Sequence, residues 1–126
     1  MITGFYHPGF AAPIGEHIMP MRKFALVAEG LRTMAGVRLA KPAPAREDDL
    51  RRVHTAEYIA AVRTGTPRVL AESQKFPWSP ALFPSVCLTN GACIAAAAPV
   101  SQNHLRLRRD QDAPEFLPST VPRYEA

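Results

Sequence analysis

His17-Ile18-Met19-Pro20-Met21-Arg22-Lys23-Phe24 is the stretch that decides the fold, because it opens a helix that we expect to reach Met34. Pro20 suits the first turn of that helix, where its missing N–H removes no intrahelical hydrogen bond. Gly36 then follows as a left-handed stop. Apolar residues recur every three or four positions and predict one stripe of a buried helix: Phe24, Val27, Leu31 and Met34.

The same stretch carries candidate binding residues. His17, Arg22 and Lys23 lie at the mouth of the predicted helix, where a substrate or an anion could be met. Ordinary structural roles are the alternative: a loop histidine with one hydrogen bond, and surface cations that are slightly unfavourable against the helix dipole. Both interpretations stay open at this point.

The composition is that of a soluble globular protein, with 126 residues, 47% hydrophobic and 21% charged. We expect a cytoplasmic chain that does not bind membranes, because the N-terminus lacks a secretory pattern and no apolar run approaches the ~20 residues of a span. The net charge of +4 is dispersed, with basic residues beside acidic ones over 46–52, so we expect no nucleic-acid binding. Cys87 and Cys93 are predicted to be buried thiols.

The predicted elements are strands over 2–6 and 37–40 and helices that begin near Asp48, over 56–63 and over 85–98. Their order is typical of an α/β sheet protein. Thr55 should cap the 56–63 helix, and the Asn90-Gly91 pair permits a close backbone approach. From Pro99 no periodicity persists, so we predict a folded part at 1–98 and a loosely ordered tail at 99–126.

Three passages resemble the N-terminal part of the histone deacetylase superfamily, in particular bacterial class IV-like deacetylases and the related acetylpolyamine amidohydrolases. The passages are FYHP at 5–8 with HIMPMRKF at 17–24, EDDL at 47–50 with VHTAEYI at 53–59, and FPWSP at 76–80 with NGAC at 90–93. The resemblance covers residues 1–98. It implies a partial arginase/deacetylase-like fold, a parallel sheet with flanking helices.

Complete relatives are zinc-dependent enzymes that hydrolyse acetyl-lysine-like or acetylpolyamine substrates. The family's tandem His-His and Asp-x-His motifs do not occur in this sequence. The resemblance therefore implies an N-terminal fragment, truncated before the catalytic half and inactive alone. We expect it to have no catalytic or metal-ligating residue and no cofactor of its own, and an acetylated substrate is implied by the resemblance alone.

The resemblance also suggests roles for the candidate residues. Lys23, or alternatively Arg22, falls where relatives have a basic residue in an internal channel, and His17 falls near the opening of the active site. Trp78 would wall the substrate entrance, although packing alone explains it equally well. A different class of function is also open: a small interaction module, whose protein partner covers an exposed sheet edge.

Overall fold

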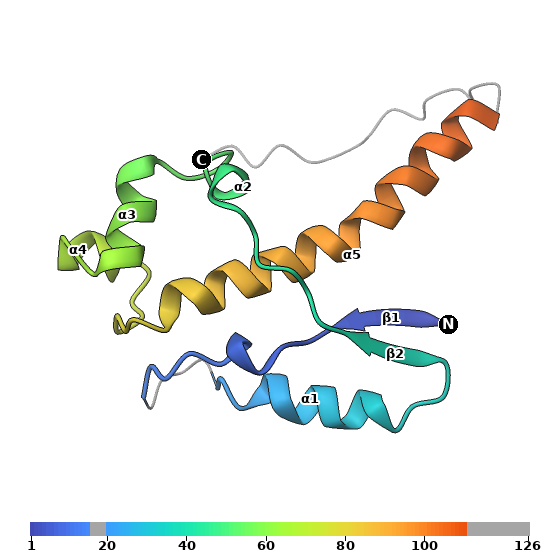
Figure 1. The fold of residues 1–126 in the computed structure, drawn as a ribbon, viewed down its shortest axis with the longest axis horizontal. Coiled ribbons are helices and arrows are strands. Elements are labelled where there is room, and N and C mark those ends of the chain that lie inside the picture. Colours follow the sequence, from blue (N-terminus) through green and yellow to red (C-terminus); the bar gives the residue numbers. More distant parts are fainter. Residues whose placement is uncertain (16–19, 111–126) are drawn as a thin grey trace, which may run out of the picture.

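The computed structural model describes residues 1–15 and 20–110. Two short strands, β1 (Ile2–Phe5) and β2 (Val37–Ala40), pair in parallel with Ile2 opposite Val37. Parallel pairing requires a crossover connection, which here contains helix α1 (Lys23–Arg32), packed beside the strands (Figure 1). Both predicted strands are confirmed, the first one residue shorter than expected. Within the described ranges the sheet has two strands, so each has an outer edge.

Helix α1 is less buried than its apolar stripe predicts. Ala28 is its buried residue; of the predicted stripe, Phe24 and Leu31 are half-buried, Val27 is 59% exposed, and Met34, 55% exposed, lies beyond the end of the helix. The expectation of a buried helix is therefore wrong. The spacing marks the apolar side correctly, but a two-stranded sheet and the short 3-10 helix η1 (Pro8–Phe10) are too small to cover it. Gly36 has φ +80° as predicted, but it does not end the helix: α1 ends at Arg32, short of the predicted Met34, and Gly36 lies in the turn that leads to β2.

The middle of the chain forms three helices: α2 (Glu47–Leu50), α3 (Ala56–Thr64) and α4 (Arg68–Ala71). The Thr55 hydroxyl accepts a hydrogen bond from the Tyr58 N–H at 3.2 Å, which confirms the predicted cap of α3. Gly65 ends α3 with φ +78°. Leu50 is buried, whereas Val53 is 78% exposed because α2 has already ended at Leu50.

Helix α5 (Leu82–Asp110) is the longest element and crosses the molecule between the two groups of shorter elements (Figure 1). It starts before the predicted helix and continues through Pro99, whose missing N–H does not end it. The prediction that regular structure ends at residue 98 is therefore wrong for 99–110. Residues 111–126 lie outside the described part, and the domain boundary at 98/99 stays a prediction.

The Leu82–Pro99 stretch has 18 residues and a mean hydropathy of 1.4, so its length and composition suffice to cross a membrane. This corrects the expectation that no apolar run approaches a span. Core helices of soluble proteins have the same length and composition but are mostly buried, whereas 22% of this window is buried, with Leu82, Ser85 and Cys87 in the core. The absence of membrane binding stays a prediction.

The core consists of two clusters that both include residues of α5. The first joins Leu82 to Ala12, Ile14 and Val62, and the second joins Cys87 to Ala45, Leu50 and Ile59. A buried hydrogen bond of 2.7 Å from the Ser85 hydroxyl to the Phe10 carbonyl fastens α5 to η1. Cys87 is buried as predicted, whereas Cys93 is exposed because the second half of α5 extends beyond the core.

The connection from β2 to α2 crosses α5 at Gly91 (Figure 1). Ala45 donates its N–H to the Cys87 carbonyl at 2.7 Å. A Cβ atom on Gly91 would overlap the Ala43 carbonyl oxygen and lie 2.8 Å from the Ala45 nitrogen. The close backbone approach expected from the Asn90-Gly91 pair is thus confirmed.

Candidate functional site

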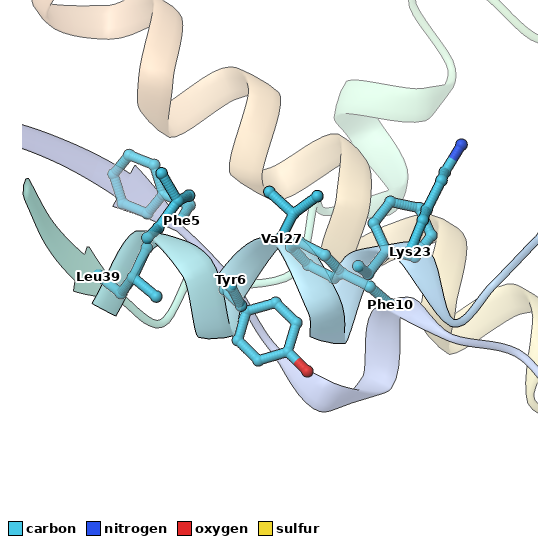
Figure 2. A pocket seen from close by; sticks show the side chains of 9 residues that line it. Phe5, Tyr6, Phe10, Lys23, Val27 and Leu39 are labelled. Carbon is cyan, nitrogen blue, oxygen red and sulfur yellow. The ribbon is translucent and has the colours of Figure 1, made fainter. Parts of the chain in front are cut away.

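An apolar pocket of about 240 Å³ lies between α1 and the strands (Figure 2). It is built where the stripe of α1 faces side chains of β1, β2 and η1. Its lining is largely aromatic and aliphatic: Phe5, Tyr6, Phe10, Lys23, Phe24, Val27, Ala28, Leu31 and Leu39. The pocket forms because α1 belongs to the crossover connection between β1 and β2. This connection packs the helix beside both strands, although the two strands lie far apart in the sequence.

Three aromatic rings form a connected wall. Tyr6 and Phe10 meet edge to face with centroids 5.8 Å apart, and Phe10 meets Phe24 in the same way at 5.7 Å. Such pairs favour a fixed geometry, because ring edges and faces carry opposite partial charge. The three rings therefore form one continuous aromatic side of the pocket.

Cations lie close to two of these rings. The Lys23 ammonium lies 5.3 Å from the Phe24 ring centroid, and the Arg32 guanidinium lies 5.7 Å from that of Tyr6. In Figure 2 the Lys23 ammonium points upward and the Tyr6 hydroxyl points downward, away from each other. The described lining residues include no carboxylate, imidazole or thiol. The pocket can therefore accept an apolar group near a positive charge, but its lining offers no acid–base pair for hydrolysis.

The predicted site residues are not brought together. His17 lies outside the described residues. Arg22 is exposed at the N-cap of α1 and does not belong to the pocket lining, whereas Lys23 does. Trp78 belongs to the first core cluster, which does not include the pocket residues. The roles suggested for these residues stay predictions.

Trp78 has the contacts of a packing residue. Its indole N–H donates to the Val62 carbonyl at 2.6 Å, and its backbone N–H donates to a Glu72 carboxylate oxygen at 2.8 Å. The Arg68 guanidinium lies 5.0 Å from the ring centroid. A Cβ on Gly65 would come within 2.8 Å of the indole, so the ring fills the space above this glycine. These are the contacts of a packing residue, and the role of Trp78 at a substrate entrance stays a prediction.

Zinc does not fit the described residues. In 1–15 and 20–110, no group of three His, Cys, Asp or Glu side chains lies close enough to hold a metal ion. His7 accepts a hydrogen bond from the Gly9 N–H through Nδ1 at 2.9 Å, and the exposed His54 ring lies against Tyr58. His7 thus has a local structural hydrogen bond and His54 a local ring contact. No catalytic step through zinc is derived for them.

A charged cluster joins α2 to α3 at the edge of the second core cluster. Glu47 accepts from Arg51 at 2.8 Å and from Arg63 at 2.6 Å, which confirms the expected internal pairing of this segment. Arg63 also lies over the Phe83 ring at 5.2 Å. Burial raises the pKa of the nearby Cys87 thiol, the positive charge of Arg63 acts in the opposite direction, and Glu47 raises the pKa further. The thiol is thereby kept protonated and unreactive.

The sequence did not identify the pocket residues on β1, η1 and β2 or the residue that follows β1: Phe5, Phe10, Leu39 and Tyr6. Their proximity to α1 depends on the pairing of two strands 35 positions apart. The sequence signal that could have indicated the pocket is the apolar stripe of the predicted 20–34 helix. Where strands cover only part of such a stripe, an apolar pocket remains beside the strands.

Comparisons with known proteins give one partial likeness. "Histone deacetylase 2" of Oryza sativa subsp. japonica is 36% identical over 65 residues, which are 52% of this chain and 13% of the rice protein. No protein-family model matches the chain. No solved structure matches it either. The chain thus spans about an eighth of the length of this curated relative, and the match supports a distant histone deacetylase-like relationship.

Proposed function

We propose that this chain supplies the opening part of a histone deacetylase-like α/β domain, and that further polypeptide completes the fold and the catalytic centre. The observation that carries this proposal is the 65-residue match to the rice protein. In the proposal, the completed domain is a zinc-dependent hydrolase of acetyl-lysine-like or acetylpolyamine substrates. The resemblance to bacterial class IV-like deacetylases and a cytoplasmic location belong to the same proposal.

The sheet supports this proposal independently of the match. Parallel strands are usually covered on both faces and embedded among several neighbours. Here two strands of four residues each have outer edges, and the first residue of β1, Ile2, is 71% exposed. A pair of this size is only marginally stable by itself. An extended sheet would pair these edges and cover the apolar side of α1.

The proposal predicts that the isolated chain lacks the zinc binding and the hydrolytic activity of the completed domain. We expect the purified chain to retain less than one equivalent of zinc after dialysis, because the described residues offer no converging ligands. We also expect no chelator-sensitive hydrolysis of an acetyl-lysine peptide. One equivalent of retained zinc together with chelator-sensitive turnover would overturn the assignment of catalysis to other polypeptide.

A chimera provides the positive test. Residues 1–98 of this chain are joined to the portion of the rice protein that follows its matched region, and the rice portion alone is the control. We expect acetyl-lysine hydrolysis by the chimera and little or none by the control, because the control lacks the opening strands and helices. A soluble, folded chimera without activity, beside an active parent rice protein, contradicts the proposal.

The lining role of Lys23 can be tested in the same chimera. In the proposal Lys23 supplies positive charge in the channel, and its position at the pocket supports this over Arg22. We expect Lys23→Met to lower turnover more than Arg22→Met. Equal activity of both variants would indicate that Lys23 is a surface cation without a role in the channel.

A second candidate is a small interaction module, favoured by the exposed apolar half of α5. Ile94 is 48% exposed, and Cys93 and the alanines at 96–98 are also exposed. A monodisperse chain that unfolds cooperatively and fails to complement in the chimera would support this second function. An isolated chain without a cooperative transition would count against it.

A further inference from the structure

We draw no further inference here: the strongest candidate, the exposed apolar half of α5 over residues 92–99, is an unpartnered helix face, and nothing in the described part of the chain shows what covers it.

Discussion

Replacing Gly91 by alanine tests the crossing of the β2–α2 connection over α5. In most helices Gly→Ala is stabilising by about 1 kcal/mol, because alanine loses less backbone entropy. At Gly91 the new Cβ would overlap the Ala43 carbonyl and lie 2.8 Å from the Ala45 nitrogen. Both neighbouring groups are backbone, so no flexible side chain can move aside to relieve the clash.

The loss of stability expected for Gly91→Ala follows from the displacement of the β2–α2 connection. Moving the connection away breaks the 2.7 Å hydrogen bond from Ala45 to Cys87, which costs about 1 kcal/mol. It also loosens the second core cluster, and overpacking of this kind costs roughly 1–3 kcal/mol. Less the gain in helix propensity, we expect Gly91→Ala to lower the free energy of unfolding by about 2 kcal/mol.

Gly30 is the matched control, because it lies within helix α1 and an added Cβ would meet no atom within 4 Å. Gly30→Ala should raise the free energy of unfolding by up to about 1 kcal/mol. Urea unfolding followed by circular dichroism and by fluorescence of Trp78 measures both variants under the same conditions. The reasoning is refuted if Gly91→Ala stabilises the chain as much as Gly30→Ala does.

Removing the cap of α3 by Thr55→Ala should cost about 0.5–2 kcal/mol in urea unfolding, because the Tyr58 N–H loses its acceptor; an unchanged midpoint would contradict this. A thiol reagent at pH 8 should label exposed Cys93 at least tenfold faster than buried Cys87, and equal rates by mass spectrometry would show that the core opens freely. Burial raises the pKa of Cys87, so the folded chain holds that proton more tightly than the unfolded chain, and stability should fall as the pH rises above the ordinary thiol pKa. A Cys87→Ala variant should lack that part of the fall in alkaline urea titrations, and an identical pH profile would refute the linkage. The chain should associate and bind an apolar dye through α5, and Ile94→Lys should reduce both; a dye-negative monomer on size-exclusion chromatography would contradict the exposed face.

Local chemistry predicted the parts of the fold whose limits depend on neighbouring residues. Thr55 marks the start of α3 correctly, since a hydroxyl cap acts within one turn of the chain. The glycine at 91 also indicated a close approach. What crosses there, however, depends on residues more than 40 positions away, and no local pattern identifies them.

The errors have a common physical cause. The spacing of Val27 and Met34 shows which side of α1 is apolar, but it does not show how much neighbouring structure is present to cover that side. The loss of periodicity after Pro99 suggested an end of regular structure, yet α5 continues through Pro99 to Asp110. The pocket beside Lys23 depends on the pairing of β1 with β2, and no local sequence pattern indicates that pairing.

Helix α5 packs against β1 and η1 on one side and against α3 on the other, and it is the element through which these two groups are joined. During synthesis both groups leave the ribosome before α5 does. The partners of these groups on α5, Ser85 and Cys87, are its fourth and sixth residues, and at roughly 5–20 residues per second they are translated within about 0.3–1.2 s of the start of the helix. For that interval Phe10 and Ile59 lack their partners on α5. The nascent chain is therefore most vulnerable to chaperone capture or to aggregation just before α5 emerges.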